Sequence, residues 1–321
     1  MVIIIFILYY YHRMLFEIFH LLFLAGWIGD IGLLLFCVKK LFHLDPLCLL
    51  YFAFYIFVEY FDKLPFFDYV SLMYLNSYKK YFKYEKTNNL EIMIDYDNGK
   101  KNIVIVGPHG VFMTSPIAIG IYGLQRKNAN KFKLFVSPLV SMNPMVNLVC
   151  KMIQNGNKVE SLHHTNVIRN LKENKYNLCV SGGGFEEINM FNNMQNVIYG
   201  NRWRYWIYNA IKHNYNINFC YLYGGTQDYR SILNSTTLLS LRRWFAKYYI
   251  PFNIVYGKFL LLPFNDVELT EVFFHLDLPY NPNITKEEAN VYLDKFYKEV
   301  IKILETTKPK NGQHSFVLID K

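Results

Sequence analysis

Hydrophobic positions follow two different patterns along the chain. In residues 1–75 they form long apolar runs: residues 14–38 are interrupted only by Glu17, His20 and Asp30, and residues 47–58 follow Pro46. Spanning a membrane takes about 20 apolar residues in a helix. The first run is long enough. The second is short and would form a re-entrant or interfacial helix, or half of a hairpin. Residues 1–75 are therefore predicted to be membrane-anchoring segments that form an N-terminal hydrophobic membrane hairpin. A second domain is predicted over residues 76–321.

A cleaved secretory signal peptide is the competing interpretation of the N-terminus. Such a peptide needs a positively charged start and a small-residue cleavage site. The sequence begins Met1-Val2-Ile3 and no Ala-x-Ala follows. We therefore expect a retained anchor.

Beyond residue 76, short apolar runs alternate with helix-like stretches. Several of these runs end in glycine turns, which is typical of buried strands that lead into helices. This pattern predicts an α/β fold with a mostly parallel sheet flanked by helices. The expected strands are residues 102–106, 134–136, 178–181 and 217–223, with edge strands within 250–262 and 272–278.

The clearest helical pattern lies near the C-terminus. Thr285 and Glu288 have the spacing of a capping box, and apolar residues then recur every three or four positions. Lys308-Pro309 ends the pattern.

Composition narrows the classes of partner. Hydrophobic residues make up 52% of the chain and charged residues 18%, against about 45–50% and 25% in soluble domains. The net charge is +9 with no dense Lys/Arg block, so a membrane surface or an anionic cofactor fits better than a nucleic acid. The five cysteines are widely spaced and no metal-binding motif occurs; we expect reduced thiols on the cytosolic side and no metal.

Gly107-Pro108-His109-Gly110 directly follows a predicted strand. The turn would hold His109 at the carboxyl edge of the sheet, where open α/β folds bind their ligands. Histidine titrates near neutral pH and can act as a general base. The alternative is a structural turn whose imidazole caps a helix.

Two further segments contain candidate binding residues. In Ser181-Gly182-Gly183-Gly184-Phe185-Glu186-Glu187, consecutive backbone amides could form an oxyanion site, or the glycines could simply form a tight turn. In Asn201-Arg202-Trp203-Arg204, two guanidinium groups beside a tryptophan could hold a phosphate or an adenine. The alternative for that segment is an ordinary helix start on the surface.

Taken in order, these motifs resemble the type 2 diacylglycerol acyltransferase family, which includes monoacylglycerol and wax-alcohol acyltransferases. Tyr81-Phe82 resembles the family's Tyr-Phe segment, residues 107–110 stand where it has His-Pro-His-Gly, residues 182–186 match its glycine–glutamate block, and Asn201-Arg202 match the start of its next block. The resemblance covers nearly the whole chain.

The resemblance implies a membrane-bound enzyme that esterifies diacylglycerol to triacylglycerol with acyl-CoA as co-substrate, without another cofactor and without an acyl-enzyme. His109 would be the general base, and Glu186 would orient it or line the pocket. The substrate-binding residues would be Gly107, Pro108, Gly110, Gly182, Gly183, Gly184, Asn201 and Arg202, with Arg202 holding coenzyme A phosphate. The expected location is the endoplasmic reticulum or lipid droplet membrane, with the catalytic domain in the cytosol.

Departures from the family pattern keep alternatives open. Gly107 replaces the family's first histidine, Trp203-Arg204 replace Lys-Gly, and His275-Leu276-Asp277 replace a late Gly-x-Pro. The alternatives are a monoacylglycerol or fatty-alcohol acceptor, a catalytically inactive lipid-binding protein that keeps the fold, and a hydrolase in which His109 activates water. The sequence also leaves the oligomeric state open, a homo-oligomer included.

Overall fold

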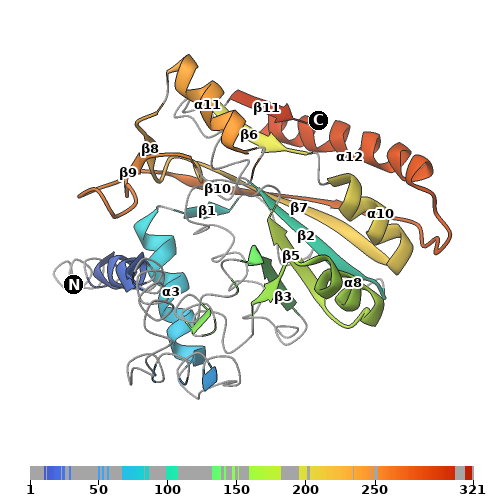
Figure 1. Ribbon diagram of the computed structural model, residues 1–321, viewed down its shortest axis with the longest axis horizontal. Helices are drawn as coiled ribbons and strands as arrows, with labels where there is room; N and C mark the ends of the chain where they lie inside the picture. The colour runs from blue at the N-terminus through green and yellow to red at the C-terminus, as the bar shows by residue number, and fades with distance from the viewer. Residues whose placement is uncertain are drawn as a thin grey trace, which may run out of the picture. The chain divides into compact units, whose positions relative to one another are not determined.

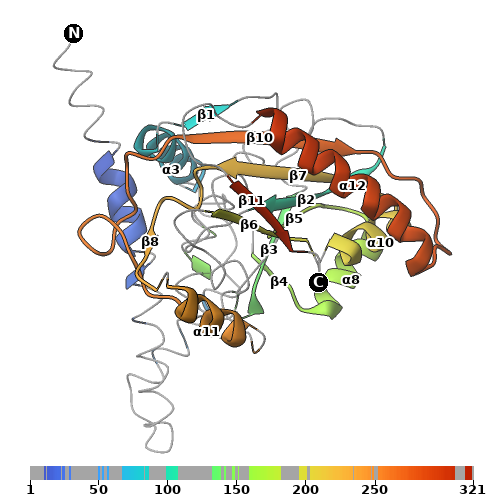
Figure 2. The same ribbon diagram turned by 90° about the horizontal axis from the view of Figure 1, so that it is seen from above.

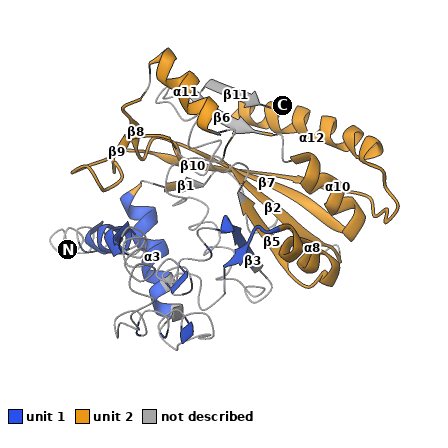
Figure 3. Ribbon diagram, in the orientation of Figure 1, with its two compact units in different colours: residues 1–81, 133–163 blue, residues 82–132, 164–321 orange. Residues whose placement is uncertain are grey.

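The structure is a computed structural model, and its contacts divide the chain into two compact units (Figure 3). Unit 1 comprises residues 1–81 and 133–163, and unit 2 comprises residues 82–132 and 164–321. The structure describes residues 11, 13–22, 24–25, 29, 50, 53, 56–57, 67–82, 84–86, 99–107, 132–138, 141, 147–148, 151, 159–181, 195–200, 203–233, 235–246, 248, 252–307 and 315–319. The predicted boundary near residue 75 stays a prediction.

Unit 1 contains α3 (Phe67–Tyr81) and a parallel pair of short strands, β3 (Phe132–Val136) and β4 (Glu160–Ser161). The strand expected at residues 134–136 is thus confirmed. Its Lys133 ammonium lies 3.1 Å from the Glu160 carboxylate on the partner strand.

The hydrophobic membrane hairpin predicted for the N-terminal segment is not supported. Among the residues that the structure describes, no helix is both long and apolar enough to cross a membrane. The helical residues after residue 10 carry an Arg13–Glu17 ion pair (3.5 Å) and a buried His20. The Phe16 ring packs against Tyr81 of α3, with ring centroids 4.5 Å apart. Polar groups therefore interrupt the run that hydropathy alone assigned to the membrane.

Unit 2 is an α/β structure, as predicted, and its central sheet has the strand order β1–β10–β7–β2–β5 (Figure 1). β2 is parallel to both β5 and β7, and β1 is parallel to β10. Only the β10–β7 pair in this order is antiparallel. The bounds are β1 Tyr84–Lys86, β2 Lys101–Gly107, β5 Asn177–Ser181, β7 Tyr215–Tyr223 and β10 Leu269–Leu276.

The strands expected at residues 102–106, 178–181 and 217–223 are confirmed by β2, β5 and β7. β7 ends in a glycine turn because Gly224 has a φ of +81°, and a Cβ there would lie 2.3 Å from the Glu268 carbonyl oxygen. The strand expected within 272–278 exists as β10, but it is not an edge strand, since β1 pairs with its other side.

Among the described residues, unit 2 has four helices: α8 (His164–Glu173), α10 (Trp203–His213), α11 (Thr236–Ala246) and α12 (Lys286–Thr307). Figure 2 shows α12 running across β10 and β7. The capping box at its start is confirmed, because the Glu288 N–H donates to the Thr285 hydroxyl (3.2 Å) and the Thr285 N–H donates to the Glu288 carboxylate (2.8 Å). Its buried residues are Ala289, Leu293, Phe296, Val300 and Leu304.

The described part of unit 2 also contains two small ladders. β6 (Gln195–Tyr199) pairs in parallel with β11 (Ser315–Ile319), which the sequence pattern did not predict. β8 (Arg230–Ser231) pairs with β9 (Val255–Tyr256), antiparallel. The edge strand expected within 250–262 is therefore only two residues long, and it belongs to this separate ladder.

Candidate functional site

Of the predicted site residues, Gly107 is described, and it lies buried at the end of β2. It pairs with Tyr221 of β7. The remaining predicted residues lie outside the described residues: Pro108, His109, Gly110, Gly182, Gly183, Gly184, Glu186, Asn201 and Arg202.

The described strands nevertheless fix where the first two motif segments begin. β2 and β5 are parallel neighbours, and Val106 pairs with Ser181. Gly107 and Ser181, each the last residue of its strand, therefore end at the same edge of the sheet, within one register step of each other. Residues 108–110 and 182–184 continue the chain directly from these two points. That edge is where open α/β sheets bind ligands.

Residues 201–202, which begin the third motif segment, lie in the sequence between two described residues, Gly200 and Trp203. Gly200 accepts hydrogen bonds from the Trp203 N–H (2.9 Å) and from the Tyr297 hydroxyl of α12 (2.8 Å). α10 runs from Trp203 to His213 and then returns into β7 through Asn214, so its N-terminus points toward the carboxyl edge of the sheet. The third segment thus precedes the end of α10 that points toward this edge.

Trp203 itself is a core residue. It has no exposed surface, it stacks on Tyr297 (ring centroids 5.2 Å apart) and it meets Phe219 of β7 edge-on (5.2 Å). The indole therefore anchors α10 on the sheet and cannot stack on an adenine. Arg204, one residue on, is exposed.

The face of the sheet opposite α10 and α12 contains buried polar side chains. Successive strand residues point to opposite faces, and Phe219 packs toward the helices. Asn218 and Cys220 therefore point away from them. Their neighbours on β10 are His275 and Glu271, and all but His275 of these side chains are at most 1% exposed.

Glu271 is the member of this face nearest to the carboxyl edge. It pairs with Leu222, one position beyond the Tyr221 that pairs with Gly107. The Cys220 thiol donates to its carboxylate (3.6 Å). The sequence analysis did not select Glu271, because a single glutamate in an apolar strand carries no motif.

The buried thiols are poor nucleophiles. Burial raises the pKa of Cys179 to about 12, and burial followed by the nearby Cys179 raises the pKa of Cys220 well above its ordinary value. Because the thiolate is the reactive form, both side chains stay protonated and unreactive at neutral pH. The expectation of reduced thiols agrees with these two cysteines being free.

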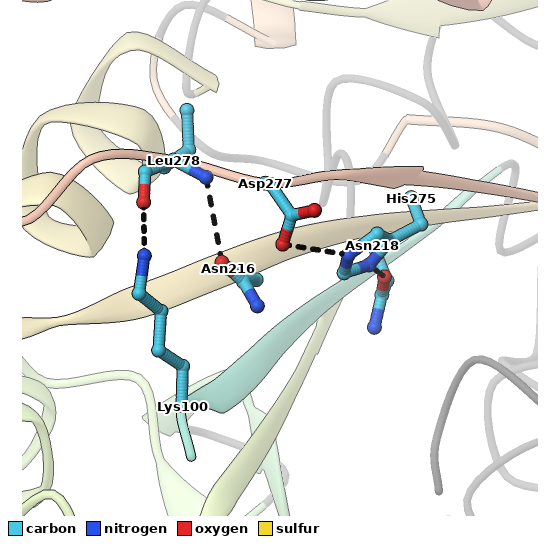
Figure 4. A network of polar contacts seen from close by, with 6 residues as sticks. All are labelled: Lys100, Asn216, Asn218, His275, Asp277 and Leu278. Atoms are coloured by element: carbon cyan, nitrogen blue, oxygen red, sulfur yellow. Dashed lines mark hydrogen bonds and ion pairs between the residues drawn. The ribbon is translucent and has the colours of Figure 1, made fainter. Parts of the chain in front are cut away.

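The segment around His275 lies away from the edge where β2 ends. His275 pairs with Asn218, which is level with Val104 in the middle of β2. Its Nδ1 lies 2.5 Å from the Asn218 Oδ1, and its Nε2 lies 3.1 Å from the Asp277 carboxylate (Figure 4).

The same network continues toward the amino edge. The Leu278 N–H donates to the Asn216 Oδ1 (3.4 Å), and the Lys100 ammonium donates to the Leu278 carbonyl (Figure 4). These bonds tie the end of β10 to β7 and to the start of β2. The network is therefore a structural tether on the far side of the sheet from the predicted motifs.

The described part of the chain contains no group of three or more His, Cys, Asp or Glu side chains that could hold a metal ion. Comparisons of the chain with protein-family models, curated proteins and solved structures found no match.

Proposed function

We propose that the protein is an acyl-CoA-dependent O-acyltransferase that esterifies a neutral-lipid alcohol, with diacylglycerol as the first choice of acceptor. One observation carries the proposal: Gly107 and Ser181, which begin the first two candidate motifs, lie at the same edge of the sheet, and Gly200 precedes α10, whose N-terminus points toward that edge. A histidine, a run of glycine amides and an arginine that follow these points can serve one reaction.

In the proposed reaction, the His109 imidazole accepts the proton of the acceptor hydroxyl as the oxygen attacks the thioester carbonyl carbon. An alcohol is too weak an acid to attack without such a base. The new C–O bond forms a tetrahedral oxyanion, to which the amides of residues 182–184 donate. The C–S bond then breaks, and the coenzyme A sulfur takes the proton from the imidazolium.

The remaining proposed roles concern binding. Glu186 orients His109, and the Arg202 guanidinium pairs with a coenzyme A phosphate, for which a planar fork of donors is suited. Both described cysteines stay protonated through burial. Direct transfer between two bound substrates is proposed, without an acyl-enzyme.

The test supplies labelled oleoyl-CoA to the full-length chain, expressed in a host that makes no neutral lipid. Diacylglycerol, monoacylglycerol, a fatty alcohol and lysophosphatidate are offered separately, and the products are separated by thin-layer chromatography. Label in triacylglycerol is the expected result. Label in a different ester keeps the reaction and changes the acceptor.

Two other outcomes contradict the proposal. Labelled free fatty acid without any ester indicates a hydrolase. Absence of label from every lipid, with acyl-CoA still bound by the folded chain, indicates an inactive lipid-binding protein.

A further inference from the structure

The turn that follows β9 exposes three large apolar side chains in succession. Phe259, Leu260 and Leu261 are 78%, 73% and 53% exposed. Single exposed apolar residues are ordinary on a protein surface, whereas contiguous ones mark an interaction site. Figure 1 shows this part of the chain projecting as a loop beyond β9. We call residues 259–261 the apolar tip.

Two residues of the apolar tip have a strained backbone. Phe259 has a φ of 50° and Leu260 a φ of 71°, both in the left-handed region. Side chains with a Cβ adopt this region at a cost, and turns normally place Asn or Gly there. Strain of this kind persists at functional positions. Local folding therefore favours Asn and Gly at two positions where the chain has Phe and Leu.

The base of the tip is tightly held. The Leu260 N–H donates to the Gly257 carbonyl (3.1 Å), and the buried Tyr229 hydroxyl donates to the Leu261 carbonyl (2.8 Å). Gly257 is required there, because a Cβ would lie 1.9 Å from the Leu262 carbonyl oxygen. The apolar side chains are thus presented on a fixed support.

Cationic groups lie at the base of the tip. The Lys258 ammonium is 5.0 Å from the centroid of the Phe259 ring. Arg230 pairs with Tyr256, immediately before Gly257, and its guanidinium lies over the Phe264 ring at 4.7 Å. Apolar groups flanked by cations are suited to a lipid surface that carries negative headgroups, and the chain's net charge of +9 favours the same partner.

We propose that the apolar tip docks on a lipid surface that contains anionic lipids. Phe259, Leu260 and Leu261 enter the boundary between headgroups and acyl chains, and Lys258 and Arg230 contact the headgroups. The inference deepens the proposed function and rests on it for its purpose, since a neutral-lipid acceptor is reached from such a surface.

The direct test measures contact with lipid in the full-length chain, reconstituted with vesicles of phosphatidylcholine and phosphatidylserine. Phe259→Trp adds an indole at the tip. Val291→Trp, at a position of α12 that is 70% exposed, is the matched control. Brominated lipid should quench the added fluorescence of Phe259→Trp and leave that of Val291→Trp nearly unchanged. Equal quenching of the two variants would overturn the proposal.

A second measurement uses the double variant Phe259→Asn/Leu260→Gly, which puts favoured residues at both left-handed positions. Its melting temperature should stay the same or rise, while its partitioning onto the vesicles falls by about a hundredfold, as expected from the lost apolar burial. Lys258→Gln should weaken partitioning only when phosphatidylserine is present. Unchanged partitioning, or a change in oligomeric state in its place, would contradict a lipid partner.

These outcomes separate the two proposals. Ester formation without lipid contact at residue 259 would overturn only the proposed docking of the apolar tip. A chain that is quenched at residue 259 but transfers no acyl group would overturn the proposed reaction alone.

Discussion

The two faces of β7 are equally buried and chemically opposite. Phe219 and Tyr221 face α10 and α12 and meet other rings, whereas Asn218 and Cys220 face away from those helices and meet His275 and Glu271. The first face is stabilised by the burial of its aromatic rings against those of the helices. Buried polar groups cost free energy unless they are hydrogen-bonded. The polar side chains of the second face therefore depend on specific hydrogen-bond partners on the neighbouring strand.

The largest effect on stability is expected on the aromatic face. Trp203→Ala would remove an indole that has no exposed surface, and such truncations cost about 3–5 kcal/mol of unfolding free energy. Trp244→Ala, at a tryptophan of α11 that is 50% exposed, should change it by less than about 0.5 kcal/mol. Urea unfolding followed by circular dichroism measures both. Equal losses would mean that the two tryptophans are equally packed.

The polar face of the sheet should be unreactive toward thiol reagents. Cys179 of β5 belongs to it, because Cys179 pairs with Val104 and Val104 pairs with Asn218. With a pKa raised from 9.0 to about 12, Cys179 in the folded chain should react with iodoacetamide about a thousandfold more slowly than in denaturant. Peptide mass spectrometry reads Cys179 and Cys220 separately. Because folding raises this pKa, the associated stability is fully present below about pH 9 and is lost as the pH rises through about 12. Rapid labelling of Cys220 in the native chain would show that this face is open to solvent.

Asn218 and His275 should be energetically coupled across the β7–β10 pair. A double-mutant cycle with Asn218→Ala and His275→Ala should give a coupling of about 1 kcal/mol, since the contact is a partly buried hydrogen bond. The control cycle combines Asn216→Ala with His275→Ala. Asn216 bonds to Leu278 instead, so this coupling energy should be smaller. A zero coupling between Asn218 and His275 would mean that the network of Figure 4 contributes no stability.

The smallest effect is expected at the start of α12, which covers the aromatic face. Thr285→Ala removes the side chain that caps the helix, at a cost of about 1 kcal/mol. Thr306→Ala, in the last turn, removes bonds only to the Lys302 and Ile303 carbonyls, which lie within the same helix, and should cost less. The order of the two unfolding free energies is the result to check, and a reversed order would contradict the capping account.

Sequence patterns sufficed where the signal is local. Strands β2, β5 and β7 were predicted because each is a short apolar run that ends at glycine or serine, and α12 was predicted from Thr285 and Glu288. The N-terminal hairpin was wrong, because hydropathy counts apolar residues and ignores the packing of Phe16 against Tyr81.

The polar face could not be predicted because it depends on register. Asn218 and His275 are 57 positions apart and meet only through the antiparallel pairing of β7 with β10. Trp203 beside two arginines suggested a binding residue, and only the tertiary contacts with Tyr297 and Phe219 identify it as core. In the site, the ends of β2 and β5 follow from local sequence, whereas their adjacency follows only from the pairing of the two strands.

The central claim is that the segment leaving β2 at Gly107 supplies the base for acyl transfer. The most direct measurement compares His109→Ala with His164→Ala, a change at an exposed histidine at the start of α8, in the labelled acyl-CoA assay. The account predicts that His109→Ala loses ester formation by at least about a hundredfold while it still binds acyl-CoA, and that His164→Ala stays active. Full activity in His109→Ala would contradict the account.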